Sequence, residues 1–537
     1  MTMIRRLIIQ NFKGIKKADI MFNDFKNIIV GNNGVGKSTI IESLSLALGY
    51  GLNKLEITPY IFHSSVLEQF KIDKEPPSII IEVYFDEKKD EFSGTNNTMH
   101  GLYRGLQLKI CFDEESYTEL YELEKDSCTQ IPCEYYKIER YWFSDKPVKQ
   151  LLMPYSVQLV DSSSTYFNSS SNQYIAHLLR KYIGDDDFTK IKSCLRHLKQ
   201  DFEEKQSICD INTKLKQERE NLELSIDVTS KIIFRDIICP FLENIPIEQI
   251  GAGELCILKT MLSIDKKHQT EKQKIIIIEE PESHLSHTKM YELIRKIEEN
   301  ISPEQTQLII TTHNSFIANK LDLSNLILIE NENGEIVTRK IDKDESYDTF
   351  KFFTKVSNYP TLRLLLCKSA ILVEGPTDEM ILTYYYYQKY GHHPFDDSIE
   401  LISVEGVGFK EYVNLISKFQ KKIAIVTDND GHNIEDVKKQ RGISTLPYSI
   451  SLFTEEDINL NTLEPSFVRK NIDKLQELSD TIRGRKKPND TEKDLVEYMT
   501  SNKTEWAFKL LNQENVPDFN IPDYMIEAIN WVKGNDR

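Results

Sequence analysis

The chain has 537 residues, more than one ordinary domain needs, and its length alone predicts about three domains. Hydrophobic residues make up 40% of it, which excludes a disordered protein, and no apolar run reaches the roughly 18 residues of a membrane helix, so we expect a cytoplasmic protein with no membrane partner. The net charge of −17 argues against nonspecific coating of DNA, whose phosphates attract basic surface, but leaves room for a local basic groove.

The first part of the chain predicts strands followed by helices. Residues 4–30 alternate short apolar runs with polar breaks, which predicts three strands, and the stretch STIIESLSLALGYGL that begins at residue 38 has the spacing of a helix. Residues 77–145 are rich in strand-forming sequence. Residues 174–236 are helical and highly charged, a pattern more typical of a solvated or dimerising insert than of a catalytic segment.

Strand character returns in the second half. Residues 274–280 and 307–313 predict buried strands, and residues 325–341 predict a hairpin about Asn333-Gly334. A charged stretch, DKDESYDTFKFF, then marks a domain junction. From Ser369 onward strands and helices alternate, which predicts a small parallel sheet with crossover helices.

Residues 31–39 read GNNGVGKST and fit the phosphate-binding pattern G-x-x-x-x-G-K-[ST] between a predicted strand and a predicted helix. Backbone N–H groups of such a loop close around phosphates, and the positive end of the helix adds to the attraction. Lys37 is expected to reach the β- and γ-phosphates, and Ser38 to hold Mg²⁺. The alternative, a glycine-rich turn that merely precedes a helix, fits the order of strand, loop and helix less well. The residues expected to bind nucleotide here are Asn32, Asn33, Gly34, Gly36, Lys37, Ser38 and Thr39.

Other nucleotide-site residues lie at the ends of later elements. The isoleucine-rich strand delivers Glu279 and Glu280 to its end, where Glu279 is expected to contact Mg²⁺ and Glu280 to orient the attacking water. Upstream, IGAGELCIL places Gly253 at the start of a helix. Downstream, LIITTH ends a strand in His313, a residue that taken alone would also suit a structural role.

This order of phosphate loop, signature, acidic strand and histidine resembles the ATP-binding-cassette ATPases of the SMC and RecF type. The resemblance implies ATP as the ligand, His313 as a phosphate sensor, and a dimer in which the signature of one subunit closes on its partner's nucleotide. IGAGE stands where that family has LSGGE, and Gly251 in place of serine weakens the contact with the γ-phosphate. The stretch between Lys37 and Gly251 is too short for a long coiled coil, so the insert is expected to be compact.

A second group of acids follows two strands of the C-terminal part. Glu374 and Asp378 follow the strand AILV, and Asp428 and Asp430 follow IAIV. Because the carboxyl ends of parallel strands face one crevice, we expect these four side chains to lie together. They would repel one another unless Mg²⁺ or Mn²⁺ neutralised them. VEG and DND are each common in other contexts, so the combination predicts the metal site rather than either motif.

Together these motifs resemble the Toprim domain, and Toprim behind a P-loop ATPase resembles the layout of the OLD family of nucleases, including the nuclease subunit of Gabija-type defence and the OLD effectors of some retrons. The resemblance implies that Glu464 supplies a second metal site and that Lys503 stabilises charge on the phosphate, although Lys503 also fits an ordinary solvated lysine. The catalytic residues expected over the two sites are Glu280 in the nucleotide site and Glu374, Asp428, Asp430 and Lys503 in the carboxylate site. The expected metal ligands are Ser38, Glu374, Asp378, Asp428, Asp430 and Glu464.

Three further features are weaker expectations. Gly406 and Gly408 fall where backbone must pass close to the carboxylate site. Glu455 and Glu456 are candidate acids of the same region. The run RGRKK, residues 483–487, suits either a contact with the DNA backbone or a solvated loop.

We therefore expect an α/β fold, with an ABC-type, SMC/RecF-like P-loop ATPase that carries a helical insert, followed by a Rossmann-like Toprim domain. Residues 1–155 form the N-terminal part of the ATPase and residues 156–245 the insert, which is expected to dimerise. Residues 246–345 complete the ATPase. Residues 346–537 form the Toprim nuclease domain with a helical extension.

The leading hypothesis is an ATP-regulated, divalent-metal-dependent DNA endonuclease that serves in anti-phage defence, as the resemblance implies. A RecF/SMC-like DNA-binding clamp for repair or recombination, without nuclease activity, is the alternative, and a regulatory ATPase that delivers a toxin is a third. Neither of these needs the acidic residues, which therefore argue against both. Expected partners are DNA and further copies of the chain in a dimer or tetramer. Family membership suggests a helicase, or a retron reverse transcriptase with its DNA, as a neighbour.

Overall fold

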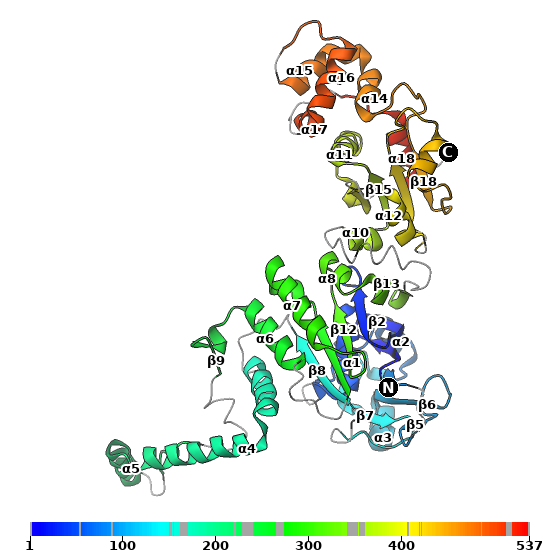
Figure 1. Ribbon diagram of the computed structural model, residues 1–537. Coiled ribbons are helices and arrows are strands. Elements are labelled where there is room, and N and C mark those ends of the chain that lie inside the picture. The colour runs from blue at the N-terminus through cyan, green and yellow to red at the C-terminus, as the bar shows by residue number, and fades with distance from the viewer. Residues whose placement is uncertain are drawn as a thin grey trace. The chain divides into compact units, whose positions relative to one another are not determined.

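The computed structural model describes most of the chain in two compact units (Figure 1). The described residues are 3–52, 55–86, 90–149, 153, 155–161, 170–218, 222–227, 240–264, 273–340, 353, 360–404, 408–417, 419, 421–484, 486–511 and 518–534. The first unit comprises Met1–His313 and Asn325–Thr338, and the second comprises Asn314–Ser324 and Arg339–Arg537. The chain thus first leaves the first unit at the peptide bond between His313 and Asn314.

The first unit is built on a twelve-stranded sheet in the order β5-β6-β4-β1-β2-β14-β13-β3-β12-β11-β8, with β7 paired to β6. Its strands are β1 Arg6–Phe12, β2 Ile15–Met21, β3 Lys26–Val30, β4 Ile79–Tyr84, β5 Ser93–Gly94, β6 Tyr103–Phe112, β7 Tyr136–Trp142, β8 Tyr155–Asp161, β11 Gln273–Glu279, β12 Thr306–Thr311, β13 Leu326–Glu332 and β14 Glu335–Lys340. The three strands expected within residues 4–30 are confirmed as β1, β2 and β3.

The sheet has an antiparallel and a parallel half. Strands β6, β4, β1 and β2 pair antiparallel, whereas β13, β3, β12, β11 and β8 pair parallel. The parallel strands are buried apolar runs such as the four isoleucines of β11, as expected of strands covered on both faces. Because β8 pairs with β11, its residues belong to the sheet rather than to the insert expected from residue 156. The predicted hairpin joins β13 to β14, and positive φ at Asn333 and Gly334 (56° and 89°) forms its turn.

Helices cover this sheet and form the insert. The helices of the unit are α1 Lys37–Ala47, α2 Ser64–Asp73, α3 Glu114–Glu124, α4 Ser170–Glu203, α5 Gln206–Glu218, α6 Ala252–Ile264 and α7 His287–Asn300, with a small hairpin of β9 Phe241–Leu242 and β10 Ile245–Pro246. Single 3-10 turns are η2 Pro59–Ile61, η3 Lys125–Ser127, η4 Cys133–Tyr135, η7 Ile247–Gln249 and η9 Pro281–His284. The insert consists of α4, interrupted at Gly184 where φ is 77°, and the exposed α5 (Figure 1).

The second unit contains a four-stranded parallel sheet in the order β16-β15-β17-β18, which confirms the predicted alternation of strands and helices. Its strands are β15 Ser369–Val373, β16 Ile399–Ser403, β17 Lys422–Val426 and β18 Ile450–Phe453. Its helices are α8 Ser315–Lys320, α10 Thr361–Leu366, α11 Pro376–Tyr390, α12 Phe409–Ile416, α13 Ile434–Gln440, α14 Leu463–Lys470, α15 Leu475–Arg483, α16 Glu492–Ser501, α17 Lys503–Leu511 and α18 Asp523–Lys533, with 3-10 turns η10 Leu323–Asn325, η11 Pro394–Asp397 and η12 Ile472–Lys474.

The helical extension shares one core with this sheet. The side chains of α14, α15, α16 and α17 belong to the same buried apolar cluster as those of β15 and β17. Phe467 and Trp506, both fully buried, have ring centroids 5.3 Å apart. Helix α18 returns to pack on β15, β17 and β18. The last part of the chain therefore supports the edge of the sheet where the acidic residues lie.

The short helix α8, which follows His313, contacts the short helix α10, which precedes the second sheet. In α8, the Asn319 Oδ1 atom accepts a hydrogen bond from Thr361 Oγ1 of α10 at 2.6 Å, and Ser315 Oγ accepts one from the Leu362 N–H at 3.3 Å. Helix α10 then leads into β15. Among the residues that the structure describes, no helix has the length and apolar character to cross a membrane.

Candidate nucleotide and nuclease sites

The phosphate loop connects β3 to α1. Gly34 and Gly36 have φ of 77° and 110°, values that favour glycine, and Gly36 caps the start of α1. At Gly31 a Cβ atom would lie 2.7 Å from Val35 Cγ1, so a side chain has no room there. The ammonium of Lys37, whose side chain is 5% exposed, donates to the carbonyl oxygens of Gly31 at 3.0 Å and Asn32 at 3.3 Å. Asn32, Asn33, Gly34 and Ser38 are exposed, and Thr39 is partly exposed.

The acidic strand and the sensor histidine come to the same edge as this loop. Strands β3, β12 and β11 are parallel neighbours, so the residues that follow them share one edge. Glu279 is the last residue of β11, and the Glu280 N–H donates to the Thr311 carbonyl of β12 at 3.0 Å. The Glu280 Oε1 atom lies 3.6 Å from Lys37 Nζ and 3.9 Å from His313 Nδ1. The structure thus brings together Lys37, Glu280 and His313, as the sequence predicted.

Glu282 is a residue of this site that sequence reasoning missed. Its side chain is 5% exposed, and its Oε1 atom accepts hydrogen bonds from Thr312 Oγ1 at 2.6 Å and from the His313 N–H at 2.8 Å. The same oxygen lies 3.2 Å from His313 Nδ1. Glu282 therefore fixes both the backbone and the ring of the sensor histidine. A third glutamate, two residues after Glu280, was the signal available in the sequence.

The signature segment opens α6. Gly251 precedes this helix, and Glu254, in its first turn, lies 3.7 Å from Lys289 Nζ. A Cβ atom at Gly253 would come within 2.5 Å of the His284 carbonyl oxygen. Gly253 therefore permits the close approach of α6 to η9 within one chain. Its expected contact with nucleotide remains a prediction.

The predicted carboxylates also converge on one edge of a parallel sheet. Glu374 follows β15 and Asp428 follows the neighbouring β17. The Glu374 Oε1 atom accepts hydrogen bonds from the Asp428 N–H at 3.1 Å and from Thr427 Oγ1. Thr427, which is buried, thereby fixes the orientation of the Glu374 carboxylate.

The turn after β17 explains the sequence DND. Asn429 is fully buried, and its Nδ2 donates to the carbonyl oxygens of Glu455 at 2.9 Å and Asp457 at 3.0 Å. Its Oδ1 accepts from the Gly431 N–H at 2.8 Å. Asp430 has a φ of 49°, so the chain turns directly after Asn429, and the buried amide of Asn429 holds the turn between Asp428 and Asp430. Asn429 is therefore a structural residue between two candidate ligands.

Asp378 and Glu464 complete the acidic cluster from two helices. Asp378, in the first turn of α11, accepts a hydrogen bond from the Gly375 N–H at 3.2 Å, and Glu464 Oε2 accepts one from Thr462 Oγ1 at 2.9 Å. Burial raises the pKa of Asp378 to about 7, and the carboxylates of Glu374 and Glu464 act in the same direction. Burial likewise raises the pKa of Asp428 to about 8, again with the help of the surrounding carboxylates. The other four predicted acids thus all lie within electrostatic range of Asp428.

The chemistry of these donors fits a divalent cation. Carboxylate oxygens are the ligands that hard cations prefer, and burying several together is unfavourable without a positive charge. Within the described ranges, no three His, Cys, Asp or Glu side chains are yet arranged around a single ion position. Two of the acids instead face a cation of the protein itself. The other three acids, Asp378, Asp428 and Glu464, form no ion pair with this cation.

That cation is Arg441, the second residue, after Glu282 of the nucleotide site, that sequence reasoning missed. It follows α13, and its Nη2 atom donates to Glu374 Oε1 and to Asp430 Oδ2, the latter at 3.0 Å. Tyr524 of α18 is a third. It is buried, and this burial, with the nearby charges of Asp428 and Asp378, raises the pKa of its hydroxyl well above the ordinary value. No sequence pattern links either residue to the acidic motifs.

The remaining predicted residues are placed as follows. Lys503 is the first residue of α17, which packs on α11, and its side chain is exposed. Glu455 Oε1 accepts a hydrogen bond from the Glu456 N–H at 3.0 Å. Gly408 precedes α12 with a φ of 86°, whereas Gly406 lies outside the described residues.

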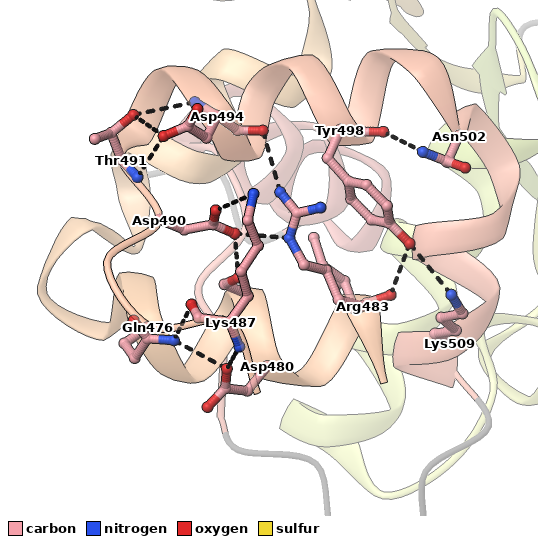
Figure 2. Close-up of polar contacts among 12 residues, drawn as sticks. Gln476, Asp480, Arg483, Lys487, Asp490, Thr491, Asp494, Tyr498, Asn502 and Lys509 are labelled. Atoms are coloured by element: carbon pink, nitrogen blue, oxygen red, sulfur yellow. Dashed lines mark hydrogen bonds and ion pairs between the residues drawn. The ribbon is translucent and has the colours of Figure 1, made fainter. Parts of the chain in front are cut away.

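The basic run RGRKK has a structural task (Figure 2). Asp490, whose side chain is 1% exposed, accepts a hydrogen bond from Arg483 Nε at 2.6 Å and lies 2.8 Å from Lys487 Nζ. Burial would raise the pKa of Asp490, but hydrogen bonds from Lys487, Ser479 and Arg483 outweigh it, and the pKa falls below its ordinary value. Arg483 also lies over the ring of Tyr498, with its Cζ atom 4.1 Å from the ring centroid. Two of the basic groups considered for DNA contact therefore neutralise a buried carboxylate.

Two family models match the chain. One, described as "AAA domain, putative AbiEii toxin, Type IV TA system", matches residues 26–319, more than half of the chain. The other, described as "Overcoming lysogenization defect protein-like, TOPRIM domain", matches residues 365–430, which include Glu374, Asp378, Asp428 and Asp430.

Individual relatives span most of the chain. Endonuclease GajA of Bacillus cereus (strain HuB5-5) is 23% identical over 514 residues, which cover 79% of this chain and 73% of the relative. The OLD nuclease of Thermus scotoductus is 22% identical over 466 residues, covering 81% of this chain and 83% of the relative. The retron Ec83 probable ATPase of Escherichia coli is 23% identical over 390 residues, covering 60% and 70%.

Proposed function

The chain belongs to the AAA-domain family that its N-terminal part matches and, with the Toprim domain that follows, to the OLD family of ATPase–nucleases; from this premise we propose that it is an ATP-regulated, divalent-metal-dependent DNA endonuclease of anti-phage defence. The observation that carries the proposal is the gathering of Glu374, Asp378, Asp428 and Glu464 near one edge of the Toprim sheet, close enough to raise the pKa of two of them beyond the effect of burial. A DNA-binding clamp has no use for such a costly cluster.

In the nuclease site, five acids are assigned to binding the metal and acting near the reacting phosphate: Glu374, Asp378, Asp428, Asp430 and Glu464. A bound magnesium or manganese ion would neutralise these acids, activate water and stabilise the leaving oxygen. Thr427 Oγ1 and the Asp428 N–H hold Glu374 in one orientation, and Asn429 holds the turn that presents Asp428 and Asp430. We assign to the exposed Lys503 the role of stabilising the negative charge that develops on the phosphate.

In the nucleotide site, Lys37 exchanges its contacts with the Gly31 and Asn32 carbonyls for the β- and γ-phosphates of ATP. Ser38 and Glu279 are assigned to the Mg²⁺ ion of the nucleotide. Glu280 is assigned to the attacking water, and His313, held by Glu282, to the γ-phosphate. Each of these side chains lies at the edge where β3, β11 and β12 end.

In this proposal the protein cleaves DNA as a homo-oligomer, a dimer or tetramer, whose subunits associate through the ATPase unit and the insert. The signature around Gly253 would then complete the nucleotide site of a second copy. A helicase, or a reverse transcriptase with its DNA, is the proposed neighbour. The acidic net charge of −17 is consistent with a partner that supplies part of the grip on DNA.

The test is cleavage of supercoiled plasmid by the purified protein with Mg²⁺ or Mn²⁺, with and without ATP. Wild type is compared with Glu374→Ala and Lys37→Ala, and with Glu497→Ala and Lys17→Ala as controls at exposed positions. We expect Glu374→Ala to abolish cleavage and Lys37→Ala to change only its response to ATP. Cleavage that survives Glu374→Ala with metal present would contradict the proposal.

A further inference from the structure

Arg441 forms a bridge between two of the acids assigned to the nuclease reaction. Its Nη2 atom alone contacts both Glu374 Oε1 and Asp430 Oδ2. The arginine comes from the end of α13, whereas Glu374 follows β15, so the contact joins segments 67 residues apart. Its side chain is 26% exposed, so the guanidinium is partly accessible to solvent.

The contact divides the acidic cluster into two parts. Glu374 and Asp430 form ion pairs with the guanidinium, whereas Asp378, Asp428 and Glu464 do not. Arginine remains charged at every pH at which the protein is folded, so this compensation is permanent until something displaces it. A divalent cation is such a competitor, because two positive charges on the same carboxylate oxygens repel each other.

The guanidinium has unused donors. Among the residues that the structure describes, none forms a hydrogen bond with Arg441 Nε or Nη1, and the side chain is partly exposed. A guanidinium offers its donors as a rigid fork that matches the oxygens of a phosphate. A phosphodiester that approaches Glu374 and Asp430 therefore meets a cation that is already present at those acids.

We propose that Arg441 is a substrate-binding residue of the nuclease site that Glu374 and Asp430 hold in the metal-free protein, and that it transfers to an oxygen of the scissile phosphate when a divalent cation takes these carboxylates. This inference rests on the proposed nuclease function. Arg441 thus has two successive partners, first the acids and then the substrate. The metal ion replaces the guanidinium at the acids, and the guanidinium then binds the DNA.

The test measures metal and DNA binding separately. Mn²⁺ binding to wild type, Arg441→Gln and Arg441→Lys is measured by calorimetry without DNA, with Lys439→Gln as the control, since Lys439 is an exposed cation of the same helix. Arg441→Gln removes the competitor, so we expect it to bind Mn²⁺ several-fold more tightly than wild type. Arg441→Lys keeps the charge and should remain close to wild type. Weaker or unchanged Mn²⁺ binding by Arg441→Gln would overturn the proposal.

DNA binding supplies the second readout. Affinity for a short duplex is measured with Ca²⁺ and with EDTA at several salt concentrations. We expect Arg441→Gln to lose about tenfold in affinity, with a salt dependence reduced by about one phosphate contact, only when the cation is present. An equal loss in EDTA, or no loss in Ca²⁺, contradicts the transfer. Cleavage by wild type that Glu374→Ala does not abolish would instead refute the assignment of the nuclease site to these acids, and the Mn²⁺ titration would still test the competition.

Discussion

At the scale of single residues, Asp378 and Asp428 make the stability of the metal-free protein depend on pH. Burial raises their pKa to about 7 and about 8, from an ordinary value of 3.8. Between these values the folded protein binds protons that the unfolded chain has already released. Protonation of these two acids therefore stabilises the folded protein fully below about pH 4, and this contribution is lost as pH rises through about 8.

We expect the metal-free wild type to lose on the order of 1–3 kcal/mol more stability between pH 6 and pH 9 than Asp428→Asn, which has no charge to bury. Thermal unfolding in EDTA at the two pH values measures the difference. Asp473→Asn, at an exposed position, serves as the control. Equal pH dependence of wild type and Asp428→Asn would show that Asp428 ionises without cost.

Glu282 allows a second prediction at this scale. Glu282→Gln keeps the size of the side chain but removes the charge beside His313 Nδ1 and weakens the acceptor for Thr312 and the His313 N–H. Since this misplaces the sensor without touching the phosphate loop, we expect ATP hydrolysis to fall about tenfold while ATP affinity stays within about twofold. Steady-state hydrolysis and nucleotide titration measure the two effects, with Glu304→Gln as the exposed control. A loss of ATP affinity that equals the loss of hydrolysis would argue for a general disturbance of the site.

At the scale of elements, Asp490 joins α15 to α16 through Arg483. The Arg483 side chain is 9% exposed, so removal of Asp490 leaves a nearly buried charge without its partner. We expect Asp490→Ala to cost about 3–5 kcal/mol in the unfolding of the second unit. Lys487→Ala removes a cation that is 46% exposed and should cost no more than about 1 kcal/mol. Chemical denaturation of both variants makes the comparison, and equal costs would show that Arg483 finds another partner.

Elements were more predictable from the sequence than contacts between them. The four isoleucines of β11, the turn at Asn333-Gly334 and the alternation that begins at β15 are local patterns, because burial and turn geometry restrict which residues can occupy adjacent positions. β8 was misplaced because pairing with β11 is decided by residues more than a hundred positions away.

The candidate site shows the same division. Glu374, Asp428 and Lys37 lie in short motifs whose spacing has a physical reason, and the structure places each at the end of its strand or loop. Arg441 could not be found in this way, because the position of a cation relative to Glu374 depends on how α13 packs and not on any spacing. Asn429 was read as part of an acidic motif, although its burial gives it a structural role.

At the scale of the whole molecule, the nucleotide should control assembly. Glu280 lies close to Lys37 and His313, so Glu280→Gln is expected to retain ATP while losing the group that orients water. We expect Glu280→Gln with ATP to accumulate as a larger oligomer than the nucleotide-free protein. Light scattering coupled to size-exclusion chromatography measures this. Lys37→Ala should remain unchanged by ATP, and an ATP-independent size for Glu280→Gln would separate hydrolysis from assembly.

The peptide bond between His313 and Asn314 joins the two units directly after the histidine that we assign to the γ-phosphate. A peptide unit is planar and stiff, and α8 begins directly after it, with the Asn314 side chain accepting hydrogen bonds from the first turn. From α8 the path continues through Asn319 and Thr361 into α10, and then along β15 to Glu374. This path begins at the residue that we assign to the γ-phosphate and ends at a carboxylate that we assign to the nuclease reaction. Only Asn314 separates His313 from α8, so we expect a displacement of His313 on nucleotide binding to be passed to the start of this helix through a single residue.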